Sequence, residues 1–216
     1  MNVKKLTFLL IFFAQQASGQ LHLQFQWGSD IIQLEKVYKL GDDSIYFDEL
    51  KMYVSDFHFQ KQNRQHHILE THLIDLADQQ SLTLFPDFPV KDYETISFQF
   101  GMDSSYHVSQ SVEGDLDPLK GMYWAWNSGY IQFKCTGKCT RIPLEDQSFE
   151  FHLGGYRKPH ETRIPMLLVI QGDTVILDMK PFFEQVAHLE VVQRIMIPSP
   201  LAKSYCQFIA RNFFTK

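Results

Sequence analysis

The sequence predicts a mainly β fold, an antiparallel β-sandwich or flattened barrel with one C-terminal α-helix. Three observations predict it: short stretches in which apolar and polar residues alternate, turn-type residues between them, and one helical pattern near the C-terminus. Many short strands separated by turns are typical of sandwiches and barrels. Because no repeat or linker-like segment interrupts the chain, we expect a single domain over residues 20–216.

The first half of the chain is predicted to consist of strands. Apolar residues occupy alternate positions in Leu21–Trp27 and Thr95–Phe100. Within Leu50–Phe59 they change parity, which predicts a bulge near Ser55-Asp56. Further strands are predicted at Val37–Leu40, Ser44–Phe47, Thr71–Leu76 and Ser81–Phe85.

Two polar segments are predicted to be loops. Lys61–His67 is expected to be exposed, although its paired His66-His67 could also catch a metal ion. Gly101–Lys120 is long for a connection within a compact domain, and such loops are usually functional or mobile.

The second half contains an aromatic-rich stretch from Gly121 to Tyr156. It is predicted to form a strand at Tyr130–Cys135, a tight turn at Thr136–Lys138 and a strand at Phe149–Leu153. A Gly172-Asp173 turn is predicted to join Met166–Gln171 to Thr174–Met179 as a hairpin. Lys180–Leu189 is predicted to form a helical turn, and Ser199 and Pro200 are typical of the start of a helix.

The first 19 residues have the layout of a secretory signal. Lys4 and Lys5 precede the apolar segment Leu6–Ala14, and small residues Ala17 and Gly19 follow at cleavage positions. The apolar segment is about half the length of a membrane span. We therefore expect a periplasmic or secreted protein that begins near Gln20 and has no membrane span after signal removal.

Net charge and cysteine content further restrict the class of protein that the sequence can encode. The net charge is −5 and the basic residues are scattered, which argues against nucleic-acid binding. In an oxidising compartment, Cys135 and Cys139 on either side of the predicted turn are expected to form a disulfide, with a soft metal pair as the alternative. Cys206 is then expected to be free and packed in the last helix.

No enzyme motif is found in the sequence, but nine histidines offer ligands for copper. The sharpest candidate is His152, whose imidazole is predicted to lie on the sheet face opposite its apolar neighbours, near Trp124 or Trp126. His22 and His107 are candidates for a second imidazole, and for each histidine a surface or hydrogen-bonded role is the ordinary alternative. Further candidates are Met52 and Met122 as soft ligands, and Asp103, Asp115 and Asp117 as ligands of a hard cation or as turn caps.

Several blocks resemble one family. They are GMDSS (101–105), LDP (116–118), GMYWAWNSGY (121–130) and FEFHLGGY (149–156), supported by KMYVSD (51–56) and IMIPSP (195–200). Together they resemble the MbnP-like family, whose namesake is a methanobactin-associated, copper-binding periplasmic protein. The resemblance spans most of the chain after the signal.

The resemblance implies a secreted β-rich domain. In members linked to copper, it implies copper bound through histidine and a tryptophan oxidised to kynurenine by a dihaem peroxidase-like partner. Matched ligand and tryptophan positions here are His152, Trp124 and Trp126. Copper-binding members often carry a histidine where this chain has Lys51-Met52-Tyr53, so Met52 would have to substitute.

The leading hypothesis is therefore a non-enzymatic, exported copper-binding protein for periplasmic copper uptake or handling. The alternative is a metal-free binding or assembly module of the cell envelope. An enzyme is favoured only if the Gly101–Lys120 loop lines a pocket in which acidic side chains converge.

Overall fold

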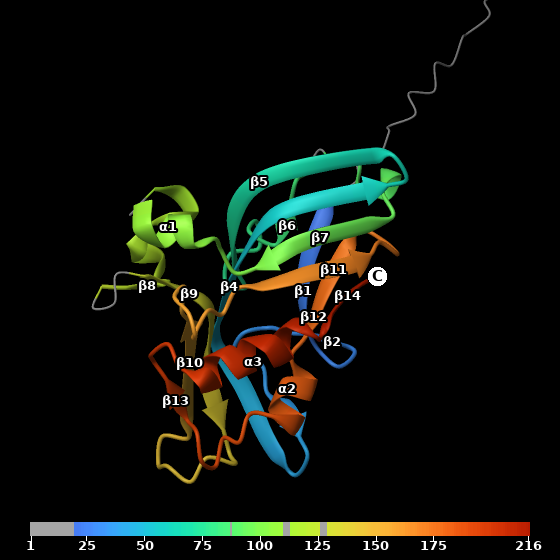
Figure 1. Ribbon diagram of the computed structural model, residues 1–216. Coiled ribbons are helices and arrows are strands. Elements are labelled where there is room, and N and C mark those ends of the chain that lie inside the picture. Colours follow the sequence, from blue (N-terminus) through green and yellow to red (C-terminus); the bar gives the residue numbers. More distant parts are fainter. Residues whose placement is uncertain (1–19, 87, 110–112, 126–128) are drawn as a thin grey trace, which may run out of the picture.

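The strands of the protein form two mixed sheets, and the larger one curls into a half-barrel (Figure 1). The computed structural model describes residues 20–86, 88–109, 113–125 and 129–216. The predicted signal segment and Trp126 therefore lie outside the described residues. No helix in the described part of the chain is long and apolar enough to cross a membrane.

The larger sheet is built around the long strand β4 (Asp43–Lys61), which pairs with β5, β7, β9 and β3. Its main path runs β11-β7-β4-β9-β10-β13. The other strands are β3 (Tyr38–Leu40), β5 (Arg64–Asp75), β7 (Thr95–Phe100), β8 (Tyr123–Trp124), β9 (Gly129–Cys139), β10 (Ser148–Gly154), β11 (Ile164–Val169) and β13 (Arg194–Ile195). The predicted strands at Thr95–Phe100 and Phe149–Leu153 are confirmed.

The smaller sheet has the order β14-β12-β1-β2, with β6 paired to β1. Its strands are β1 (Leu21–Trp27), β2 (Asp30–Ile31), β6 (Thr83–Leu84), β12 (Thr174–Asp178) and β14 (Phe213–Thr215). Two strand pairs are parallel, β1 with β12 and β10 with β13, so both sheets are mixed.

The main core lies between the sheets and is rich in aromatic side chains. The apolar residues of β1 are buried at alternate positions, as the period-two pattern predicts, and Gln26 near its end is buried as well. The rings of Phe149, Phe151 and Phe183 contact one another in it, with Phe151 stacked on Phe183 and the other two pairs tilted. Helices α2 (Lys180–Gln185) and α3 (Pro200–Ala210) close the core, and Cys206 is buried among them as expected.

The predicted C-terminal helix is confirmed, including its start. Ser199 has an extended backbone and its hydroxyl accepts a hydrogen bond from the Ala202 N–H at 3.1 Å. Pro200 occupies the first turn, where its missing N–H leaves no helical hydrogen bond unmade. The sequence therefore determines where this helix begins.

The predicted bulge in β4 is also confirmed. The register shifts between Ser55 and Phe57 against β5, and between Ser55 and His58 against β7. Asp56 lies at both shifts with a positive φ of 56°. The strand consequently keeps Val54 and Phe57 in the same core although their parities differ.

Three local predictions are wrong. Lys61–His67 is no loop, because β4 and β5 pair up to Lys61 and Arg64 and leave only two residues between them. Thr136–Lys138 is no turn but the end of β9, which pairs with β4 on one side and β10 on the other. Gly172-Asp173 joins no hairpin, since β12 lies between β1 and β14 and has no free edge for β11.

Candidate metal sites

A second, smaller core covers the outer face of β4 and β9. It contains buried Tyr53, Leu73, Met102, Leu116, Met122, Trp124, Tyr130 and Ile131. The predicted loop Gly101–Lys120 covers it with the short helix α1 (Ser104–Ser109) and the 3-10 turns η2 (Gly114–Leu116) and η3 (Pro118–Lys120), and β8 follows. The Tyr53 and Tyr130 hydroxyls donate to the Asp115 and Leu116 carbonyls at 2.8 and 2.9 Å. This segment is therefore packed on the sheet by its own residues.

His107 of α1 is the most deeply buried of the candidate histidines, with an exposed fraction of 3%. Its Nδ1 accepts a hydrogen bond from the Tyr130 backbone N–H at 2.9 Å, and its ring stacks on Tyr156 at 4.5 Å. Burial lowers the pKa of His107 to about 4, and the Asp103 carboxylate offsets only part of that effect. The imidazole is consequently neutral at neutral pH.

The other nitrogen of His107 has a mismatched neighbour. Its Nε2 lies 2.9 Å from Gln132 Nε2, while Gln132 Oε1 accepts from the Met102 N–H at 2.8 Å. A neutral imidazole has one accepting nitrogen, so it cannot accept from both Tyr130 and Gln132. Exchanging the two amide atoms of Gln132 would turn its NH₂ toward the Met102 N–H instead. Among these contacts of His107 and Gln132, only the one at His107 Nε2 therefore lacks a matched donor and acceptor.

His152 lies on β10, directly opposite Lys134 of β9, and is half-buried. Burial and, next, the Lys134 ammonium lower the pKa of His152 below its usual range, although Glu150 and Glu49 oppose the shift. This imidazole is thus also neutral at neutral pH. Its place on the outer face of the sheet agrees with the prediction that its apolar neighbours Phe151 and Leu153 point into the core.

Trp124 packs against β10 two residues beyond His152. A Cβ at Gly154 would lie 2.8 Å from the Trp124 ring, so only glycine admits the indole at this distance. The indole is buried, with an exposed fraction of 4%. Trp124 therefore packs on β10 near the position of His152, whereas His107 contacts β9 through Tyr130 and Gln132.

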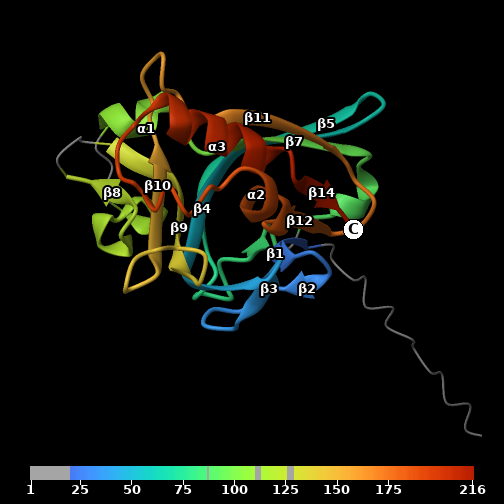
Figure 2. The same ribbon diagram turned by 90° about the horizontal axis from the view of Figure 1, so that it is seen from below.

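Two other candidates lie elsewhere. His22 is on β1 of the smaller sheet, where its Nδ1 is 3.2 Å from the Thr83 hydroxyl, and β1 lies apart from α1 in both views (Figures 1 and 2). Met52 points into the main core, whereas Met122 belongs to the smaller core beside Trp124. Whether His22, His107 or His152 binds a metal stays a prediction.

The predicted Cys135–Cys139 disulfide is wrong. Both residues lie on the single strand β9 and face the main core, with Leu50 and Ile45 as their partners on β4. Residues four apart in a strand are separated by about 13 Å, far beyond the roughly 7 Å limit for a disulfide. Burial raises the pKa of both thiols, which suits inert core residues rather than ligands.

The three acidic candidates for a hard cation make protein contacts instead. Asp117 caps η3 by accepting from the Leu119 N–H at 2.8 Å. Asp103 accepts from Ser105 and pairs with Arg163. Asp115 accepts from the Leu73 N–H and from Lys120. These contacts correspond to the structural role that sequence analysis gave as their ordinary use.

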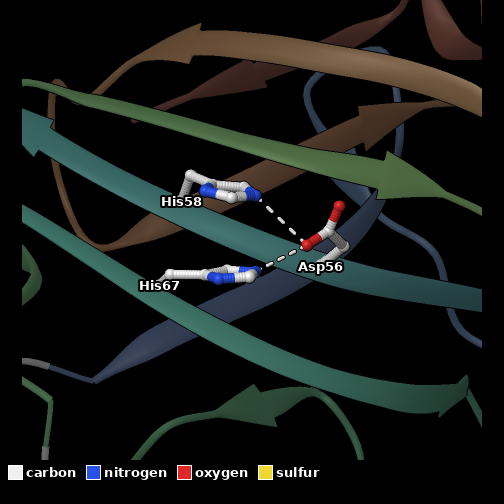
Figure 3. Close-up of side chains that lie close together, drawn as sticks. All are labelled: Asp56, His58 and His67. Atoms are coloured by element: carbon white, nitrogen blue, oxygen red, sulfur yellow. Dashed lines mark hydrogen bonds and ion pairs between the residues drawn. The ribbon is translucent and has the colours of Figure 1, made fainter.

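One group of potential ligands was missed by the sequence analysis. Asp56 and His58 of β4 and His67 of β5 lie together on an exposed surface, and their ligand atoms are all within 4.8 Å of one another (Figure 3). In the described part of the chain, no other three His, Cys, Asp or Glu residues meet this criterion. The adjacent His66-His67 could have indicated this group. Because the segment was assigned to a loop, the strand residue opposite His67 was not predicted.

Comparisons with known proteins agree with the resemblance seen in the sequence. A model of the MbnP family matches residues 16–197. Among solved structures, the chain is similar to "MbnP from Methylosinus trichosporium", with 15% identity and a TM-score of 0.58. The alignment covers 84% of this chain and 82% of that one. A search of curated proteins finds no match.

Proposed function

Because the chain belongs to the MbnP family, which is associated with methanobactin and copper, we propose that it is an exported, non-enzymatic copper-binding protein. Three placements support the proposal: His152 lies opposite Lys134 on β10, Trp124 packs on Gly154 two residues further along that strand, and His107 contacts Tyr130 of the adjacent strand β9. Uptake or handling of copper in the periplasm is the role this supports. His152 is the proposed first ligand and His107 the second.

The chemistry of these residues suits copper. Neutral imidazoles and thioethers are ligands for borderline and soft ions, and Met102 and Met122 lie in the same buried cluster as Trp124. An ion bound at His107 Nε2 requires the ring proton on Nδ1, so it would displace the mismatched contact with Gln132 and also the hydrogen bond from the Tyr130 N–H. The lowered pKa values of both histidines remove proton competition at neutral pH.

The proposal includes a partner and a modification. A dihaem peroxidase-like protein is the expected partner, and Trp124 or Trp126 the expected site of oxidation to kynurenine. Trp124 supports this because its indole lies on Gly154, two residues from His152. Oxidation would add a carbonyl or amine donor beside the imidazole.

Copper retention tests the proposal. The mature protein is equilibrated with Cu(I) or Cu(II), desalted and analysed for bound metal. Wild type is expected to retain Cu(I), and His152→Ala to bind it at least about tenfold more weakly, since loss even of an outer contact to a metal site costs that much. His188→Ala is the matched control, because that side chain is 69% exposed. Equal retention by His152→Ala and wild type would overturn the assignment of His152.

One observation favours the alternative of a metal-free module. Both ring nitrogens of His107 contact protein groups, as in a histidine that only supports a core. Absence of retained copper in the wild type would select this alternative. The third hypothesis, an enzyme, gains little support: Asp103 does share a cavity with Asp56 and Glu70, but its volume is about 90 Å³, well below the roughly 300 Å³ of small ligand sites.

A further inference from the structure

The surface group at Asp56 is built from two adjacent strands in a defined register. His58 of β4 is directly opposite His67 of β5, three pairs from the two-residue turn that joins the strands. Directly opposed residues have neighbouring side chains on one sheet face. The imidazole rings accordingly stack at 3.9 Å between centroids with an angle of 9° between their planes.

The bulge supplies the third group. Asp56 has a positive φ of 56° at the point where β4 shifts register, and its carboxylate reaches the same face as the two rings. One oxygen, Oδ1, lies 3.1 Å from His58 Nε2 and 2.7 Å from His67 Nε2 (Figure 3). Two imidazole nitrogens and a carboxylate thus converge on one small volume.

The geometry points to a metal site formed by Asp56, His58 and His67, which takes a borderline divalent ion of the Zn²⁺ or Cu²⁺ class. Imidazole nitrogens and carboxylate oxygens are the ligands such ions take, at about 2.0–2.2 Å for Zn²⁺. An ion at this point replaces the contacts that both rings now make with Asp56 Oδ1. The carboxylate selects a divalent ion over Cu(I), which prefers softer ligands.

The surroundings leave room for an ion and its water ligands. The side chains of His58, His67 and Asp56 are 50%, 47% and 33% exposed, so the rings can turn toward an ion. A surface cavity of about 450 Å³ beside them is lined by His58, Phe59, Gln60, Gln65, His66, His67 and Ser97. Three protein ligands with open positions characterise sites that exchange ligands, whereas structural sites are closed.

This site is separate from the proposed copper site. His58 and His67 pair near the free end of the β4–β5 hairpin, which points away from α1 and β8 in both views (Figures 1 and 2), although Asp56 lines a small cavity with Asp103 and Tyr106 at α1. The inference therefore does not depend on copper binding at His152. It also uses no residue of the smaller core.

Calorimetric titration with Zn²⁺ tests the inference. The mature wild type is expected to bind Zn²⁺ saturably, while His67→Asn and His58→Asn bind at least about 100-fold more weakly, the upper end of the loss caused by removing a supporting contact. His66→Asn is the matched control, because it is the adjacent residue on β5 and its ring instead packs on Phe88 at 4.9 Å. It should bind Zn²⁺ as wild type does.

A second readout shows where the ion binds. In NMR spectra, the imidazole signals of His58 and His67 should shift together on addition of Zn²⁺, with Co²⁺ giving a visible absorption band in wild type and none in Asp56→Asn. Absence of saturable Zn²⁺ binding, or equal binding by wild type and His67→Asn, would overturn the site. Retention of Cu(I) by His67→Asn is measured in parallel, so failure here and failure of the copper proposal are distinguishable.

Discussion

The buried imidazole of His107 should make the protein lose stability in acid. Its folded pKa is about 4, whereas an unfolded histidine titrates near 6.5. Between these values the unfolded chain binds more protons than the folded one, so the free energy of unfolding falls as pH falls. The difference of about 2.5 pH units corresponds to about 3 kcal/mol in total, of which about 2 kcal/mol is lost by pH 5.

The measurement is a comparison of urea unfolding at pH 7.5 and pH 5 for wild type and His107→Gln. Glutamine has no proton to gain, so the wild type should lose about 2 kcal/mol more than the variant over this range. His188→Gln, at an exposed position, should follow wild type. His72 and His152 also have pKa values lowered by burial, but their contributions are common to all three proteins. Parallel profiles for wild type and His107→Gln would refute the reasoning.

Four further outcomes are expected. Gly154→Ala should destabilise the fold by about 1–3 kcal/mol in urea unfolding, because its Cβ would overlap the Trp124 ring, and an unchanged midpoint would contradict this packing. All three cysteines should react with a thiol reagent in denaturant without reductant, and none in the folded protein; a missing thiol would indicate a disulfide. Copper retention should persist as pH falls below 6.5, because the pKa values of His107 and His152 are lowered, and loss centred at 6.5 would exclude both as ligands. Intact-mass analysis of the exported protein should show a chain that begins near Gln20, and a retained Met1 would contradict the signal prediction.

Most of the fold could be predicted because each confirmed element has a local cause. Alternation marks β1 and β7, since every second side chain must reach the core. The bulge in β4 is visible in the sequence, because the apolar positions change parity between Val54 and Phe57. The start of α3 depends only on Ser199 and Pro200. Such features depend on residues that are neighbours in the sequence, so they can be predicted from the sequence alone.

The wrong predictions arose where distant parts of the chain meet. Gly137 was predicted to be a turn residue. It is instead a strand residue that lets β4 approach closely, because a Cβ there would collide with the Tyr46 carbonyl oxygen of that strand. Because Thr136–Lys138 continue β9 instead of forming a turn, Cys135 and Cys139 lie along one strand and cannot form a disulfide. The gathering of His107 with Gln132 could not be foreseen either, because it requires α1 to fold back onto β9.

The facing histidines His58 and His67 show how the length of one turn determines which side chains meet. Since β4 and β5 are joined by Gln62 and Asn63 alone, residue pairs near the turn have fixed partners, and His58 must face His67. Asparagine is an ordinary turn residue, but Gln62 with its positive φ of 49° is not, so the turn gave no clear signal. Had the loop been one residue longer, the pairing would have shifted and the two imidazoles would no longer have faced each other. The surface metal site is therefore specified by the length of this turn as much as by its ligands.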